Sequence, residues 1–229
     1  MRGLASGSSS LSTLVQVLPR LPSVIRSMRP TWHLPALSAL DPGFLERHHI
    51  RGLIWDVDGT LTGDRRAELL PDVATPFRAL LGLPQLRHVM LSNAGEERFR
   101  QLGGMFPAVP LVRAYALGAE VLYRRRLGAD DSWTPVELEQ RLAEGARAIR
   151  KPSAALVDYA VRELGCPRDD AVMIGDQYIT DVAGANLAQV RSIKVPTLAK
   201  ESFRVSVRVS HAIEVLIYRV LYGRPAAFA

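Results

Sequence analysis

Short apolar runs recur along the chain, and polar residues follow each of them. A continuous apolar run between polar neighbours is typical of a strand that is buried on both faces. We therefore predict strands at residues 50–55, 87–91, 109–112, 171–174 and 192–195.

Helical patterns fill the gaps between these predicted strands. Thr134-Pro135-Val136-Glu137 has the form of a capping box with proline at the first helical position. We predict helices at 96–103, from Thr134 to about Ile149, from Pro152 to Gly165, and from Thr180 onward. Strands that alternate with helices predict an α/β fold, in which helices cover both faces of a parallel sheet.

Changes in composition divide the chain into three parts. Prolines, among them Pro19, Pro22, Pro30 and Pro35, interrupt residues 1–44, which we expect to form a basic N-terminal segment. Residues 45–198 contain the predicted strands and an insertion at about 114–150, and residues 199–229 form a basic amphipathic helix and a tail. The insertion is long enough for one helix and a loop, which predicts a small lid.

Composition excludes several classes of protein. The chain has 229 residues, of which 48% are hydrophobic, so it can fill a core. Cys166 is the only cysteine, which excludes an internal disulfide and a cysteine zinc site. The sequence has neither the apolar run of a membrane-spanning helix nor the pattern of a signal peptide. We therefore expect a cytoplasmic protein.

The net charge of +6 is concentrated at the two ends of the chain. Residues 1–50 carry five Arg against two acidic residues, residues 191–229 carry seven Lys or Arg against two acidic residues, and the stretch between them is slightly acidic. A basic end suggests peripheral contact with the inner face of an anionic membrane.

The C-terminal helix has the pattern that such contact requires. Its apolar positions are Val209, Ile213, Leu216 and Val220, whereas Arg204, Arg208 and His211 follow another face. A cationic amphipathic helix can lie in a membrane surface, and the N-terminal segment with Trp32 could share that interface. The alternative is a helix that packs on the sheet with its arginines in water.

Polar residues follow three of the predicted strands. Asp56 and Asp58 end the first, Ser92 and Asn93 the second, and Gly175 and Asp176 the fourth. In parallel sheets, ligands bind beyond the carboxyl ends of the strands. Neighbouring carboxylates need a compensating cation, for which Mg²⁺ is suited.

A simpler interpretation is that Asp56-Val57-Asp58-Gly59 only forms a turn and that Asp176 caps a helix. Ser92 could likewise be a helix cap, and Lys151 an ordinary surface lysine. Their combination at strand ends, in this order, favours a site for phosphate and magnesium.

These motifs resemble those of the haloacid dehalogenase-like (HAD) superfamily. They are Asp56-x-Asp58-Gly59-Thr60-Leu61, Ser92-Asn93, Lys151-Pro152 and Gly175-Asp176-Gln177-x-x-Thr180-Asp181. The stretch from Gly175 to Asn186 is similar to the fourth motif of the subclass IIIA branch called YqeG, which includes phosphatidylglycerophosphatases. Gly59 departs from that branch, which typically has asparagine there.

The resemblance implies a Rossmann-like HAD fold and a role for each matching residue. Asp56 would be the nucleophile, and Asp58 the general acid and base. Ser92, Asn93 and Lys151 would bind the substrate phosphate. Magnesium would bind Asp56, the carbonyl of Asp58, and Asp176, with support from Asp181, Gln177 and Thr60.

Only about 33 residues separate Asp58 from Ser92, so no full cap domain fits between them. An open site suits a phosphate on a large or membrane-embedded molecule. We therefore expect magnesium-dependent hydrolysis of a phosphomonoester, most simply the lipid head group of phosphatidylglycerophosphate. The alternatives are a soluble phosphatase for a sugar phosphate or nucleotide, and a non-catalytic polyanion-binding protein. No nucleic-acid-binding motif is present.

The role of Arg124-Arg125-Arg126 in the insertion is open. These arginines could form a solvated helix face, or a basic lip that receives an anionic head group.

Overall fold

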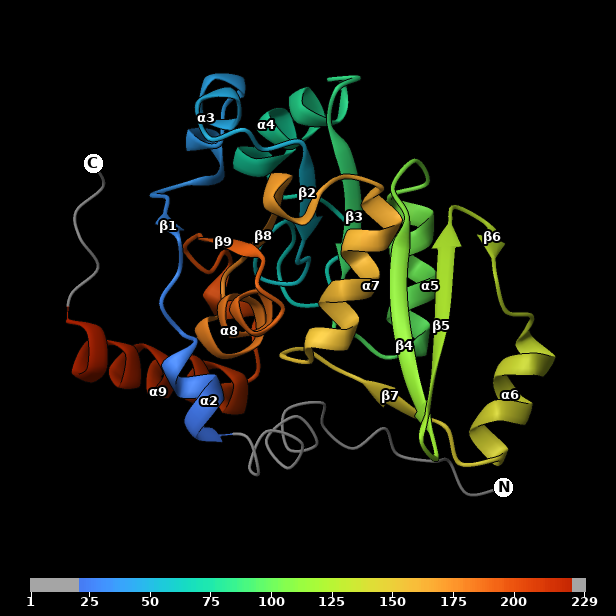
Figure 1. The fold of residues 1–229 in the computed structure, drawn as a ribbon. Coiled ribbons are helices and arrows are strands. Elements are labelled where there is room, and N and C mark those ends of the chain that lie inside the picture. Colours follow the sequence, from blue (N-terminus) through green and yellow to red (C-terminus); the bar gives the residue numbers. More distant parts are fainter. Residues whose placement is uncertain (1–20, 224–229) are drawn as a thin grey trace.

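A mixed sheet forms the centre of the molecule (Figure 1). The computed structural model describes residues 21–223; residues 1–20 and 224–229 lie outside the described part. The strand order is β1-β9-β8-β2-β3-β4-β5-β6, and β7 pairs with β4. The strands are β1 (Trp32–His33), β2 (Gly52–Trp55), β3 (Arg87–Leu91), β4 (Leu111–Leu117), β5 (Glu120–Leu127), β6 (Asp130–Asp131), β7 (Arg147–Ile149), β8 (Ala171–Gly175) and β9 (Arg191–Lys194).

The strands from β1 to β4 in this order are parallel, and β5, β6 and β7 are antiparallel to their neighbours. The helices are α2 (Leu21–Arg26), α3 (Pro42–Arg47), α4 (Pro71–Leu81), α5 (Glu96–Met105), α6 (Pro135–Ala143), α7 (Ala154–Leu164), α8 (Ala183–Leu187) and α9 (Val205–Tyr222). Short 3₁₀ turns are η2 (Leu37–Ala39), η3 (Arg168–Asp170) and η5 (Lys200–Ser202), and η4 (Tyr178–Val182) is a π-helical turn.

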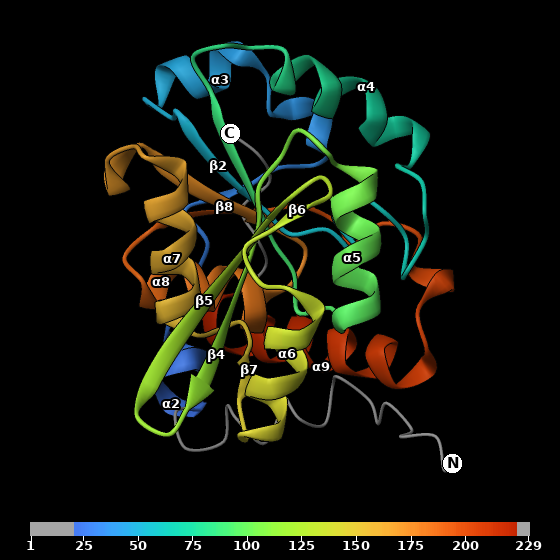
Figure 2. The same ribbon diagram turned by 90° about the vertical axis from the view of Figure 1, so that its right-hand side faces the viewer.

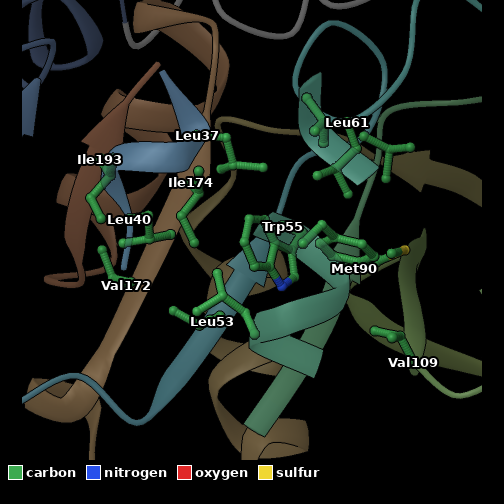
Figure 3. Close-up of a cluster of buried hydrophobic side chains, with 14 of the residues drawn as sticks. Leu37, Leu40, Leu53, Trp55, Leu61, Met90, Val109, Val172, Ile174 and Ile193 are labelled. Carbon is green, nitrogen blue, oxygen red and sulfur yellow. The ribbon is translucent and has the colours of Figure 1, made fainter. Parts of the chain in front are cut away.

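Helices cover both faces of the sheet, as predicted, and Figure 2 shows α5 and α7 on opposite sides of it. Strand β2 is continuously apolar because both of its faces are buried. Leu53 and Trp55 face a core that α4, α5 and the N-terminal turns complete, whereas Ile54 faces a second core beneath α7 and α8. Figure 3 shows the first of these cores. Alternate side chains of a strand point to opposite faces, so burial of both faces requires apolar residues throughout.

The insertion differs from its prediction as a helix and loop. It contains a helix, α6, which begins with the predicted capping box at Thr134. The helix ends at Ala143, however, and Ile149 lies in β7. Strands β4 and β5 form an antiparallel hairpin that turns at Gly118 (φ +59°), which was not predicted. Most residues of β5 are only partly buried and several are charged, so this strand contains no continuous apolar run.

The segment at residues 21–47 contributes one strand to the same sheet. Strand β1 pairs in parallel with β9, so the proline-interrupted segment supplies an edge strand. Trp32 packs against the rings of Phe44 and His48, and the guanidinium of Arg191 lies 5.6 Å from its ring centre. The Trp32 ring therefore covers the edge of the core. The part of the predicted N-terminal segment at residues 1–20 lies outside the described residues.

Helix α9 is continuous and packs on the molecule with a face that its apolar pattern did not predict. Glu214 and Tyr218 are buried, and the Tyr222 hydroxyl donates to the carbonyls of Ile25 and Arg26 in α2. The predicted apolar face instead points outward (residues Val209, Ile213, Leu216 and Val220). None of the helices within residues 21–223 is long and apolar enough to cross a membrane.

Candidate active site

The carboxyl ends of β2, β3 and β8 bring the predicted site residues together. Asp56 directly follows β2, Ser92 follows β3, and Asp176 follows β8. Lys151 reaches the same point from the loop before α7, and its Nζ donates to Asp56 Oδ1 at 2.5 Å. All four side chains are at least nine-tenths buried. A pocket opens above them, lined by Asp56, Asp58, Ser92, Asn93 and Lys151 together with Arg65, Arg98, Phe203 and Val207.

The loop after β2 is tightly wound, which places both of its carboxylates at this pocket. The backbone amides of Thr60, Leu61 and Thr62 all donate to the carbonyl of Val57. Gly59 has a φ of +97°, and a Cβ there would lie 2.7 Å from Asp176 Oδ2. Glycine is therefore required by both the backbone conformation and the approach of Asp176.

Lys151 lies between two carboxylates. Besides Asp56, its Nζ donates to Asp181 Oδ1 at 2.7 Å, and the side chain is 2% exposed. Burial lowers the pKa of Lys151, but its two carboxylate partners more than offset this, so the net shift of its pKa is upward. Lys151 is therefore held as an ammonium ion.

Asn93 holds the Lys151 backbone in place. The Lys151 amide donates to Asn93 Oδ1 at 2.7 Å, and Asn93 Nδ2 donates back to the Lys151 carbonyl at 3.2 Å. Both polar atoms of the Asn93 side chain thus bond to the Lys151 backbone and connect the end of β3 to the lysine loop. Ser92 Oγ accepts from the amide of Ala94 and retains a hydroxyl proton to donate into the pocket.

Three buried carboxylates meet beside Lys151. Oxygen atoms of Asp56, Asp176 and Asp181 lie within 4.8 Å of one another. Asp176 Oδ2 is buried and has no hydrogen-bond partner among the described residues. Burial raises the pKa of Asp56 and of Asp176, and repulsion by Asp181 adds to both increases. One ammonium cannot neutralise three carboxylates, so the donor set fits a divalent cation with oxygen ligands.

Asp181 and Thr60 both contact this cluster. The π-helical turn η4 brings Asp181 back toward the strand end, where its Oδ2 accepts the Gln177 amide at 3.0 Å. Thr60 Oγ1 donates to Asp56 Oδ2 at 3.1 Å and lies 3.5 Å from Asp176 Oδ1. The Gln177 side chain accepts from Thr180 and lies at the pocket wall.

Arg98 is a site residue that sequence reasoning did not identify. Its Nη2 donates to Asp58 Oδ1 at 2.7 Å from the first turns of α5, and its side chain is 6% exposed. The only signal in the sequence is its position two turns after Ser92-Asn93, which alone does not distinguish it from the exposed Arg100.

The three consecutive arginines of the insertion are on strand β5, so the hypothesis of a solvated helix face is wrong. Arg124 is buried and donates to Glu96 and Asp131, and Arg126 also donates to Asp131. Arg125 pairs with Glu163 of α7. None of the three lines the pocket at Asp56, so they do not form the basic lip that we considered.

Comparisons with known proteins agree with this geometry. A family model described as HAD-hydrolase-like matches residues 148–202, a range that includes Lys151, Asp176 and Asp181. The probable phosphatase YqeG of Bacillus subtilis (strain 168) is 24% identical over 165 residues, which cover 72% of this chain and 75% of that protein. These similarities support a phosphatase with a HAD-like domain.

Among solved structures, this phosphatase matches the crystal structure of an uncharacterized protein from Listeria monocytogenes serotype 4b. The identity is 18%, the TM-score is 0.41, and the match covers 63% of this chain and 78% of that one.

Proposed function

We propose that the phosphatase hydrolyses a phosphomonoester through an aspartyl-phosphate on Asp56, with Mg²⁺ as cofactor. The observation that carries this proposal is the Asp56 carboxylate, which lines the pocket while contacting the buried ammonium of Lys151. Burial raises the pKa of Asp56, and Lys151 opposes this increase, so the ammonium favours the ionised form that a nucleophile needs.

In the first step, a carboxylate oxygen of Asp56 attacks the phosphorus. The bond from phosphorus to the leaving oxygen breaks, and Asp58 donates a proton to that oxygen so that an alcohol leaves. In the second step, water attacks the phosphorus of the aspartyl-phosphate and gives a proton to Asp58. The bond between phosphorus and the Asp56 oxygen breaks, which releases phosphate and restores both carboxyl groups.

Ser92 and Lys151 bind the phosphoryl oxygens in this proposal. The Ser92 hydroxyl and the Lys151 ammonium both face the pocket that Asp56 lines. The lysine is fixed before substrate arrives, because Asn93 and Asp181 hold it. Donors that are already oriented stabilise the charge that develops on phosphoryl oxygens.

The Mg²⁺ ligands in this proposal are the carboxylates of Asp56 and Asp176 and the backbone carbonyl of Asp58, with Asp181 behind them. When bound, Mg²⁺ neutralises the clustered carboxylates and polarises a phosphoryl oxygen. The unpartnered Asp176 Oδ2 supports this assignment, because a buried carboxylate oxygen is costly without a ligand.

For the substrate we propose a phosphorylated lipid head group, specifically that of phosphatidylglycerophosphate, at the inner face of a membrane. The similarity to the subclass IIIA branch called YqeG supports it. The pocket also lacks a folded cap between β2 and β3, where only α4 intervenes. Phe203 and Val207 supply an apolar rim to the otherwise polar pocket.

A phosphate-release assay tests chemistry and substrate together. Wild type, Asp56→Asn and the control Asp72→Asn are assayed on phosphatidylglycerophosphate in mixed micelles, a sugar phosphate and a nucleotide. Asp72 is exposed at the start of α4, so its variant should match wild type. Asp56→Asn should lose activity by more than about a thousandfold.

Chelation with EDTA should abolish wild-type activity, and added Mg²⁺ should restore it. Full activity of Asp56→Asn would refute the mechanism, and faster turnover of the sugar phosphate or nucleotide would refute the lipid substrate.

A further inference from the structure

The outward face of α9 carries an apolar stripe. Its members are spaced as successive turns of one helix face and are between 50% and 76% exposed: Val205, Val209, Ile213, Leu216 and Val220. The opposite face is already used, because Glu214 and Tyr218 are buried against η4 and α2. Rotation of the helix therefore could not bury the stripe without exposing Glu214 and Tyr218.

The exposed charged side chains of α9 and of the residue before it are all positive. Arg204, Arg208 and Arg219 are exposed, and the only acidic residue of α9, Glu214, is buried on the other face. The neighbouring turn η5 adds one lysine and one glutamate, which cancel. An exposed apolar stripe flanked by arginines is complementary to a surface with anionic head groups above acyl chains.

The same helix borders the active site. Phe203, just before α9, and Val207, in its first turn, line the pocket that contains Asp56 and Lys151. A second groove, lined by Lys200, Arg208 and Arg219 with apolar residues between them, continues from Phe203 along the helix. A membrane in contact with the stripe would thus lie beside the pocket mouth.

We propose that the outward face of α9 docks this phosphatase on an anionic lipid bilayer and so presents the pocket mouth to lipid head groups. The biological role of this docking rests on the proposed function, whereas vesicle binding can be measured independently of it. Apolar side chains enter the interface, and the arginines contact lipid phosphates. The membrane-binding surface is therefore built into α9, separate from the residues that bind the phosphoryl group.

Co-sedimentation of the full chain with vesicles tests the docking surface. The vesicles are phosphatidylcholine alone or phosphatidylcholine mixed with phosphatidylglycerol. Wild type should sediment only with the mixed vesicles, and added salt should weaken its binding. Ile213→Ser/Leu216→Ser and Arg208→Gln/Arg219→Gln should each lower the partition coefficient by about tenfold or more.

The matched control is Val136→Ser/Leu142→Ser. These residues are also exposed and apolar, but they lie on α6, whose exposed charges are mainly acidic. This variant should bind like wild type. All variants should keep the wild-type thermal midpoint and the wild-type hydrolysis of a small water-soluble phosphate ester, which excludes misfolding.

Several results would overturn the proposal. They are wild-type binding by the α9 variants, equal loss in the α6 control, and a wild-type dimer that Ile213→Ser/Leu216→Ser dissociates, since a second copy would then cover the stripe. Asp56→Asn separates the two proposals, because it should bind vesicles while lacking activity. Binding without any phosphatase activity in wild type would refute the proposed function alone, and activity on the lipid without binding would refute the docking surface alone.

Discussion

Arg98 Nη2 donates to Asp58 Oδ1 at 2.7 Å, and Thr62 Oγ1 donates to the same oxygen at 3.2 Å. The amide of Arg65 is the third donor to it, at 3.3 Å. Because these contacts all fall on Oδ1, Oδ2 is the oxygen better placed to exchange a proton with substrate. Arg98 thus orients the proposed general acid and base without contacting the phosphorus itself.

Replacement of Arg98 should slow the chemical steps more than it weakens substrate binding. In Arg98→Ala, the Asp58 carboxyl loses its strongest donor, and kcat should fall by about tenfold to a hundredfold with a small change in KM. Steady-state kinetics on a water-soluble phosphate ester measure both parameters. Arg100→Ala, an exposed neighbour on α5, is the control and should match wild type.

A double-mutant cycle shows whether Arg98 acts through Asp58. In an Asp58→Asn background, the further change Arg98→Ala should cost little, because the group that Arg98 orients is already absent. Additive losses in the double variant would contradict the positioning role.

Lys151 contacts two of the three buried carboxylates, and its removal should make the fold depend on a divalent cation. In Lys151→Met, Asp56, Asp176 and Asp181 lose their buried cation, so the thermal midpoint should fall. Added Mg²⁺ should raise the midpoint of the variant more than that of wild type, since binding to the folded state alone stabilises it.

Differential scanning calorimetry with EDTA and with Mg²⁺ measures this difference. Lys200→Met, at an exposed position, should respond to Mg²⁺ like wild type. An equal response of Lys151→Met and wild type would show that the cation does not bind at this cluster.

The sequence predicts the central part of the fold because its signals there are local. Strands β2 and β8 and the second half of β3 are continuous apolar runs, and Asp56, Asp176 and Ser92 follow them directly. Asp56, Ser92 and Asp176 therefore come to one sheet edge by topology alone. Gly165 ends α7 in the left-handed conformation (φ +63°) that its prediction as a helix stop requires.

Features that depend on contacts between distant segments were not predicted. The β4–β5 hairpin is stabilised by Arg124, whose partner Glu96 lies 28 residues away in the sequence. The packed face of α9 is set by Glu214, an acidic residue that binds the backbone of η4. An apolar pattern cannot identify a helix that packs through a buried carboxyl group.

Gly175 sets the distance between β8 and Asp181, and a methyl group there should disrupt the carboxylate cluster. A Cβ at Gly175 would overlap the Asp181 carboxylate, which also accepts the Gln177 amide. Gly175→Ala should therefore lower the thermal midpoint and reduce phosphatase activity by tenfold or more, that is, by about 1.4 kcal/mol or more in activation free energy.

Gly104→Ala provides the matched control for this change. No atom lies within 4 Å of a Cβ at Gly104, which is near the end of α5. Alanine there should stabilise the folded state by about 0.5–1 kcal/mol, because glycine is unfavourable in a helix. Wild-type activity in Gly175→Ala would show that Asp181 can move without consequence.

Glu214 should make the folded state less stable as the pH rises. Burial, together with Asp176 and Asp181, raises the pKa of Glu214 to about 8, although the amides of Tyr178 and Ile179 donate to its Oε2. In the unfolded chain, the pKa of a glutamate is near its ordinary value of 4.5. Between these two values the folded state binds more protons than the unfolded state, so the free energy of unfolding decreases with increasing pH.

Glu214→Gln removes this dependence while keeping an oxygen that accepts both amides. Its free energy of unfolding relative to wild type should therefore increase from about pH 5 to about pH 8, by at most about 1.4 kcal/mol per pH unit. Urea denaturation with EDTA at several pH values measures the difference. Glu139→Gln, at an exposed position of α6, should show no such trend. Parallel pH profiles for Glu214→Gln and wild type would mean that Glu214 is ionised in the folded protein, and α9 would then pack over a buried charge.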